Sequence, residues 1–259
     1  MNSEIITEPL TNYKEAVHKA LSKLNAQPQI ASQQAIMIKP NLVNDSPYPV
    51  TTPPECCEAI IDYVRSISNA NIVIAEGTGD ASMETDDVFH ALGYQKLSQK
   101  MNIPLIDLNH APLRRLTNNQ CKVFKEMFLP ECIFDHFLIS VPVLKAHSLS
   151  EITGTLKNMM GAAPPKYYSG KHGIWKKAVF HGNMHDSIID LNRYRTPDLT
   201  VMDAGIGLPE YHLGGRECSP PLKKILVGFD PLMMDRTAAE LIDIDWRTVK
   251  HLGKALEKR

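Results

Sequence analysis

The sequence predicts an α/β protein with a mainly parallel sheet and helices on both faces, a Rossmann-like three-layer arrangement. Short β-rich apolar runs alternate along the chain with helical patterns. Several of these runs are apolar almost throughout, which is typical of strands buried on both faces. The 259 residues, 43% of them hydrophobic, are enough for a substantial core. We therefore expect a single α/β domain over residues 1–259, with a basic aromatic loop inserted at about 162–185.

The strands are expected at six apolar runs, from AIMIKPNLV and NIVIAEG to KILVGFD, and the helices between them. The stretch TTPPE (51–55) puts proline in a first helical turn with an acid nearby, which favours a helix start. Alternating strands and helices favour parallel pairing, because each crossover returns the chain to the same end of the sheet. In chain order we expect a helix over 10–26, a strand over 35–43, a helix over 54–68, a strand over 71–77, a helix over 85–99, strands over 103–108 and 136–143, helices over 147–160 and 186–193, strands over 199–207 and 224–230, and a helix over 232–257 that divides near Asp245.

Polar residues follow most of the expected strands. Sheets of this kind bind ligands beyond the carboxyl ends of their strands. Polar strand ends are also what ordinary turns look like, but here they gather at one edge. The residues that this rule selects are Lys39, Asn41, Asn44 and Asp45 after the first strand, Glu76 to Asp80 after the second, Lys145 and His147 after the fourth, Asp203 and two glycines in the fifth, and Asp230 after the sixth.

Residues 152–185 contain no Asp or Glu, although the chain has 29 acids. The segment mixes cations with Gly, Pro, Tyr and Trp, and long loops inside compact domains often form lids or binding loops. Cations beside aromatic rings suit an anionic ligand. A solvated basic face is an alternative, as is a subunit contact through Tyr167, Tyr168 and Trp175. The cations are Lys157, Lys166, Lys171, Lys176 and Lys177, with His172, His181 and His185.

Tests for metal and nucleophile motifs narrow the chemistry. His181 and His185 stand four residues apart, so they could share a metal ion if the turn is helical. The chain lacks H-E-x-x-H, G-x-S-x-G and the P-loop motif, and Glu76-Gly-Thr-Gly79 is an incomplete phosphate loop. Five cysteines occur without C-x-x-C spacing, so we expect no iron–sulfur cluster.

Composition excludes several partner classes. The net charge is −1, which argues against a nucleic-acid or membrane-surface binder. No apolar run is long enough to span a bilayer, and the N-terminal residues do not resemble a signal peptide. We expect a cytoplasmic protein whose partner is an anionic small molecule, with a homo-oligomer as an open option.

Five stretches together resemble a known family. They are IMIKPNLV, TTPPECCEAIIDYV, IVIAEGTG, SVPVLKAHSLSEITGTLKNMMG and VGFDPLMMDRTAAELI. In sequence and order they resemble the domain of unknown function 362 family, from about residue 35 to 245. Many members of that family also carry a ferredoxin-like iron–sulfur module, whose cysteines this chain lacks.

The order of P-x-T-T-P-P, IVIAEGTG and VLKAH-x9-K is also similar to the nickel-pincer lactate racemase family. That resemblance implies an acid/base at His147, a covalently bound pincer nucleotide at Lys157 and a nickel ligand at His181 or His185. Thr51 or Thr52 stands where the racemase family has an Arg, and Asp80 where it has a second catalytic His. Because racemisation of lactate needs two bases, the departures predict a related cofactor site with different chemistry.

These observations predict one site at the carboxyl edge of the sheet for an anionic small molecule or cofactor. The alternatives are a metal or pincer-type cofactor binding protein without racemase activity, and an oligomeric interaction protein. The cofactor could be nickel or another divalent metal, or a nucleotide-derived group. The expected catalytic residues are His147, Lys157 and Asp80; the expected ligand-binding residues are Lys39, Asn41, Lys145, Asn158, Lys166, Lys171 and Asp203; the expected metal ligands are His181 and His185.

Overall fold

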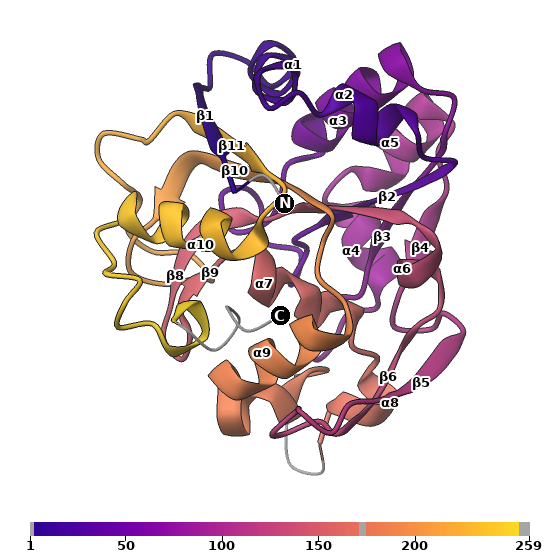
Figure 1. Cartoon of the computed structure of the whole chain (residues 1–259), viewed down its shortest axis with the longest axis vertical. Helices are drawn as coiled ribbons and strands as arrows, with labels where there is room; N and C mark the ends of the chain where they lie inside the picture. Colours follow the sequence, from indigo (N-terminus) through magenta and orange to yellow (C-terminus); the bar gives the residue numbers. More distant parts are fainter. Residues whose placement is uncertain (1–2, 171–174, 254–259) are drawn as a thin grey trace.

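The computed structural model describes residues 3–170 and 175–253. Figure 1 shows the sheet running through the molecule, with helices packed against it on both sides. The strands are β1 (Ile5–Pro9), β2 (Ala35–Pro40), β3 (Asn71–Glu76), β4 (Leu105–Asp107), β5 (Leu113–Thr117), β6 (Glu126–Pro130), β7 (Phe137–Val141), β8 (Val143–His147), β9 (Glu151–Thr153), β10 (Leu199–Leu208) and β11 (Lys224–Gly228).

The helices are α1 (Tyr13–Lys23), α2 (Gln27–Ala31), α3 (Pro54–Ile67), α4 (Thr85–Ala91), α5 (Tyr94–Met101), α6 (Cys132–Asp135), α7 (Thr155–Asn158), α8 (Pro165–Tyr168), α9 (Met184–Tyr194) and α10 (Pro231–Glu240). Short 3-10 turns are η1 (Met159–Ala162), η2 (Ala178–Asn183) and η3 (Lys250–Leu252). Across the described ranges, no helix has both the length and the apolar character that crossing a membrane requires.

The main sheet is mixed but mostly parallel, as the sequence predicts. Its strand order is β1-β11-β10-β7-β2-β3-β4. The strands β10, β7, β2, β3 and β4 pair in parallel, whereas β11 pairs in antiparallel fashion with both β10 and β1. The predicted fold class, an α/β protein with helices on both faces, is confirmed.

Alternation along the strands builds one core on each face of the sheet. Successive strand side chains point to opposite faces. In β2, Ile36 and Ile38 pack with residues of α1, α3, α4 and α5, while Met37 packs with residues of α7, α9 and α10. The helices near the N-terminus therefore cover one face and the later helices cover the other, which leaves the carboxyl edge of β2 and β3 open to loops.

The largest departure from the sequence prediction lies at residues 147–160, where a helix is expected. Instead β8 continues the path of β7 past Pro142, and β9 turns back to pair with it in antiparallel fashion. Glu151 adopts a positive φ of 57° at this turn, a conformation that no helix continues through. Only α7 and η1 follow, so the strand reaches His147 and the helical turn carries Lys157.

The other differences have local causes. The predicted helix over 85–99 is divided by Gly93, whose φ is 82°, into α4 and α5. Within the described part of the helix expected over 232–257, α10 ends at Glu240 and the short turn η3 follows; residues 254–257 lie outside the described residues. The strand β1 is not predicted. The hairpin β5–β6 is not predicted either, because β5 is largely exposed and its apolar alternation is weak.

Candidate functional site

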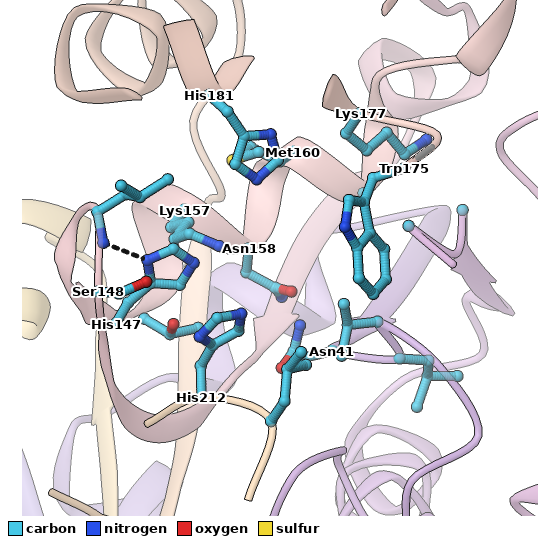
Figure 2. A pocket seen from close by; sticks show the side chains of 18 of the residues that line it. Asn41, His147, Ser148, Lys157, Asn158, Met160, Trp175, Lys177, His181 and His212 are labelled. Carbon is cyan, nitrogen blue, oxygen red and sulfur yellow. Dashed lines mark hydrogen bonds between the residues drawn. The ribbon is translucent and has the colours of Figure 1, made fainter. Parts of the chain in front are cut away.

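A cavity of about 230 Å³ lies beyond the carboxyl ends of β2, β3 and β8. Figure 2 shows His147 and His212 on one side of it, Trp175 and Lys177 on the other, and Asn158 between them. Its walls come from segments far apart in sequence: the loops after β2, β3, β8 and β10, the α7–η1 turn, and the acid-free segment. The lining residues are Asn41, Leu42, Val43, Glu76, Gly77, Gly79, His147, Ser148, Leu149, Thr153, Lys157, Asn158, Met160, Gly161, Trp175, Lys177, His181, Tyr211, His212 and Leu213.

The helix α7 is fixed by a carboxylate from a distant helix. Asp235 of α10 accepts hydrogen bonds from the backbone N–H groups of Thr155, at 2.6 Å, and Leu156, at 2.9 Å. Such bonds satisfy donors that a helix start leaves open. A Cβ at Gly154 would lie 2.2 Å from Asp235 Oδ1, so glycine is required there. Three residues after Gly154, Lys157 reaches the cavity.

Lys157 is a cation that has no counterion in the described part of the chain. Within residues 3–170 and 175–253, its Nζ has no hydrogen-bond or ion-pair partner. Burial lowers the pKa of Lys157 to about 8. An unpaired charge away from bulk water is costly, so Lys157 leaves an unbalanced positive group in the cavity wall.

At the end of β3, a buried ion pair supports the cavity wall. Lys39 Nζ lies 2.7 Å from Glu76 Oε2, and Glu76 Oε1 accepts from the Gly77 N–H at 2.8 Å. Burial lowers the pKa of Lys39, although Glu76 opposes the shift. Asn158 donates to Ser140 Oγ at 3.0 Å and lies 3.4 Å from Lys39 Nζ. Both Glu76 oxygens are therefore engaged, and Lys39 acts behind the cavity.

Lys145 fixes the loop after β2. Its Nζ donates to Asn41 Oδ1 at 2.7 Å and to the Val50 carbonyl. Burial lowers the pKa of Lys145 to about 7, with a contribution from the charge of Lys157. Lys145 thus orients Asn41, which lines the cavity, and is itself set back from it.

Two imidazoles lie against one another at the end of β8. The rings of His147 and His212 stack with centroids 3.9 Å apart and an interplanar angle of 27°. Burial, followed by the charge of Lys157, lowers the pKa of His212 to about 3 and holds the pKa of His147 well below its ordinary value. Both rings are therefore neutral at physiological pH, beside a lysine.

The acid-free segment closes the opposite wall. Lys177 donates to Asn109 Oδ1 and to the Ala163 carbonyl, and burial lowers its pKa to about 7. Trp175 lines the cavity, and His181 stands exposed on the wall with Nδ1 3.3 Å from the Ala178 carbonyl. This segment contributes a positive charge, an aromatic ring and an imidazole.

Other predicted residues lie outside the cavity lining. Asp80 Oδ1 accepts from Ser82 N, Ser82 Oγ and Met83 N. Partial burial would raise the pKa of Asp80, but these bonds and nearby Lys176 hold it below its ordinary value. Asp80 therefore stabilises a turn.

Asp203 is buried, and it accepts from the hydroxyls of Tyr13 at 2.6 Å and Tyr48 at 3.0 Å, so it anchors α1 and the loop after β2. Burial raises the pKa of Asp203. Lys166 lies 5.4 Å above the Tyr167 ring, beside a second hollow. Lys171 lies outside the described residues.

The two predicted metal ligands are not directed to a common point. His181 lines the cavity, whereas His185 Nδ1 lies 2.9 Å from His251 Nδ1 and its Nε2 lies 3.3 Å from Glu151 Oε2. Among the described residues, a group of three side chains with ligand atoms close enough for a metal ion occurs at Glu84, Asp107 and His110, away from the cavity lining.

Sequence reasoning missed several lining residues. His212 and Tyr211 lie in the loop between β10 and β11, where the pattern YHLGG combines aromatic groups with two glycines. Trp175, which the sequence analysis names only under the alternative of a subunit contact, lines the cavity. Tyr168, named under the same alternative, is 4% exposed, and its hydroxyl accepts from Phe128 N. Tyr167 remains 40% exposed.

Comparison with known proteins agrees with this architecture. Residues 36–240 match the domain of unknown function 362 family (DUF362). The chain belongs to the DUF362 family. The curated proteins contain no significant match to this DUF362 chain.

A solved structure similar to this DUF362 protein is the lactate racemase apoprotein from Thermoanaerobacterium thermosaccharolyticum. The TM-score is 0.59 and the sequence identity 13%, over 91% of this chain and 56% of the other. At this identity the likeness concerns the fold, and the DUF362 chain spans little more than half of the length of that protein.

Thr51 and Thr52, which the sequence resemblance sets against an Arg, are engaged in local hydrogen bonds. Thr52 Oγ1 accepts from Asn41 N at 2.9 Å and donates to the Val141 carbonyl at 2.6 Å, and Thr51 Oγ1 donates to the Ser46 carbonyl at 2.6 Å. Both threonines are buried. They hold the backbone and supply no positive charge.

Proposed function

We propose that the cavity binds an anionic small molecule or cofactor and that Lys157 neutralises its charge. The observation that carries this proposal is the Lys157 ammonium group, which lines the cavity without an acidic partner among the described residues. Glu76, the carboxylate in the lining, is already paired with Lys39. The described lining therefore has no free carboxylate to balance the charge of Lys157, and an anionic ligand would supply the missing negative charge.

The shape and chemistry of the lining favour a ligand with a planar part. Trp175 and Tyr211 offer aromatic surface, and Asn41 and Asn158 offer amides. Pockets of this kind combine apolar area with a few polar groups that orient the ligand. A nucleotide-derived cofactor carries both a planar ring and negative charge, so it matches this combination of aromatic, amide and cationic groups.

Lys157 also suits covalent attachment. With its pKa lowered to about 8, a useful fraction of the amine is unprotonated near neutral pH and can act as a nucleophile. A pincer-type cofactor would be carried by Lys157, and His181 would supply an imidazole to its metal. Bound there, such a group would supply a metal centre for hydride chemistry.

One observation favours binding without racemase activity. A second base is expected at Asp80, but this carboxylate is engaged by Ser82 and Met83 and is not part of the lining. Two-base racemisation would need a group there that can exchange a proton with the ligand. We infer that any reaction of this protein differs from racemisation of lactate.

The first experiment compares native and denaturing mass spectra of freshly purified protein. Added mass that survives denaturation and maps to Lys157 supports a covalent cofactor, and added mass lost on denaturation supports a reversible ligand. Bare protein is then tested by thermal shift with inorganic phosphate and adenosine monophosphate. An anion present at about 100 times its Kd stabilises by about 2.7 kcal/mol.

The matched variants are Lys157→Met and Lys166→Met. Lys166 lies in the same acid-free segment but outside the cavity lining. We expect Lys157→Met to abolish the rise in melting temperature that the anion causes, and Lys166→Met to retain it. Equal shifts in both variants would mean that the anion binds elsewhere and that the proposal is wrong.

A further inference from the structure

We propose that the histidines of the cavity are divided by tautomer: His147 presents a permanent N–H to the ligand, and His181 presents a lone pair. The inference rests on the proposed function only in naming a ligand, since the tautomers are set by the protein itself. It assigns opposite chemistry to two residues that sequence resemblance treats as an acid/base and a metal ligand.

The tautomer of His147 follows from its backbone partners. Its Nδ1 accepts from Leu149 N at 3.0 Å and lies 3.3 Å from Ser150 N; Figure 2 marks a hydrogen bond to this ring. A backbone N–H can only donate, so Nδ1 carries no proton. The neutral ring then carries its proton on Nε2, the nitrogen left for the cavity.

The hairpin makes this assignment rigid. His147 ends β8 and Glu151 begins β9, and the two residues are register partners. The N–H groups that hold Nδ1 belong to the intervening turn at residues 148–150. Switching the tautomer or adding a proton at Nδ1 would break these bonds, and protonation would also place a charge beside Lys157. Burial and Lys157 accordingly hold the pKa of His147 well below its ordinary value.

His147 can therefore donate to the ligand but cannot accept a proton from it. Its Nε2 already carries hydrogen, and its Nδ1 lone pair is engaged. The group that fits against Nε2–H is an acceptor oxygen of a carboxylate, a phosphate or a carbonyl. The same reasoning excludes Nε2 of His147 as a metal ligand, because ligation needs the lone pair that this tautomer lacks.

His181 has the opposite arrangement. Its Nδ1 lies 3.3 Å from the Ala178 carbonyl, which can only accept, so Nδ1 carries the proton. Nε2 then carries a lone pair that can bind a metal ion or take up a proton. His212 has no hydrogen bond within the part of the chain that the structure describes, and its Nδ1 is buried, so neither tautomer is imposed on it.

The opposite tautomers of His147 and His181 indicate which groups the ligand carries. One end offers an oxygen to His147 Nε2–H beside the Lys157 ammonium, and the part facing His181 offers a metal ion or an acidic proton. If a proton moves, it leaves the ligand for His181 Nε2, and the electron pair stays on the ligand as negative charge. Lys157 and His147 then stabilise that charge without taking part in the transfer.

The test is ¹⁵N spectroscopy of the histidine rings in the ligand-free protein. Couplings from ring C–H protons distinguish protonated from bare nitrogens, and the variants His147→Asn and His181→Gln assign the signals. Asparagine keeps a side-chain acceptor for the turn N–H groups, so the hairpin is retained. The exposed His90 serves as an internal reference.

We expect the His147 ring to be protonated only at Nε2 and to stay so between about pH 6 and pH 8, across the ordinary histidine range. The His181 ring should be protonated at Nδ1 at the upper end of that range. A His147 ring protonated at Nδ1, or protonated at both nitrogens above about pH 6, would overturn the proposal. A failure of phosphate to shift the melting temperature would count against the proposed function alone, because the tautomers are measured without it.

Discussion

Replacing Lys157 by methionine should stabilise the ligand-free protein. Most substitutions of buried residues lower stability. Lys157 is different because its ammonium group has no partner among the described residues, while its surroundings disfavour the charge. Methionine keeps the length and apolar character of the stem and removes the charge. Under the proposed function, the lysine is retained for binding at the expense of stability.

The magnitude follows from the pKa of Lys157. The shift from 10.5 to about 8 is a difference of 2.5 units, which corresponds to about 3 kcal/mol at about 1.4 kcal/mol per unit. Because the side chain is partly exposed, screening reduces this value, and we expect a gain of about 1–3 kcal/mol below pH 8. For a chain of this size that is about 2–4 °C in Tm per kcal/mol.

The pH dependence provides a sharper test. Below the pKa of Lys157 in the folded protein, the lysine is protonated in both the folded and the unfolded state. The full free-energy cost of burying its charge is then present. Above that pKa, the unfolded chain binds a proton that the folded protein does not, so the wild-type stability rises with pH. The advantage of Lys157→Met should therefore shrink by up to about 1.4 kcal/mol per unit above pH 8 and disappear near pH 10.5.

The assay is urea unfolding of wild type and variant at several pH values. Lys145→Met is the matched control, because burial lowers the pKa of Lys145 as well but its Nζ has partners in Asn41 and Val50. Leaving those oxygens without a donor should lower stability by about 1–3 kcal/mol. A Lys157→Met variant that is destabilised like Lys145→Met would show that Lys157 is a bonded structural residue and would refute the reasoning.

Three further predictions concern the framework of the site. Gly154→Ala should lower the unfolding free energy in urea by about 2–4 kcal/mol, because its Cβ would lie 2.2 Å from Asp235 Oδ1; Gly182→Ala, with no atom within 4 Å of its Cβ, should stay within about 0.5 kcal/mol, and equal losses would contradict the packing argument. Asp190→Asn should cost about 2–3 kcal/mol in the same assay, because this buried carboxylate accepts from three consecutive backbone N–H groups at residues 122–124; an unchanged midpoint would show that these bonds contribute nothing. Burial raises the pKa of Asp235 to about 7, so the folded protein keeps a proton that the unfolded chain releases and stability should fall as pH rises from about 4 to 7; melting curves of Asp235→Asn should lack that part of the slope, and an identical slope would assign it to other groups.

The strands were predictable because burial on both faces leaves a direct mark in the sequence. AIMIKP and NIVIAE are mostly apolar and show no alternation of polar and apolar residues, and both form central parallel strands. The departure at residues 147–160 has the opposite origin. Ser148, Glu151 and Lys157 read as the start and body of a helix, but pairing of β9 with β8 fixes part of the segment as a strand. Tertiary pairing overrides local propensity there.

The site was predictable where residues follow a strand end directly, and less so elsewhere. Asn41, His147 and Lys157 were selected by this rule and by spacing, and all three line the cavity. His212 was not selected, because the loop from β10 to β11 shows no sign in sequence of folding back over β8. Asp80 and Asp203 follow the same rule but are engaged by neighbouring donors, which no sequence pattern reveals.

The sequence by itself determined the fold class, the edge of the sheet at which the cavity lies and the lysine in the cavity wall. These features depend on periodicity, on apolar runs and on the direction of parallel strands, all of which are local properties of the chain. Only the tertiary structure decided which cations are paired, which imidazole nitrogen carries a proton and which distant carboxylate holds α7. Those features depend on distances between atoms far apart in sequence, where a hydrogen bond forms or fails within a fraction of an ångström.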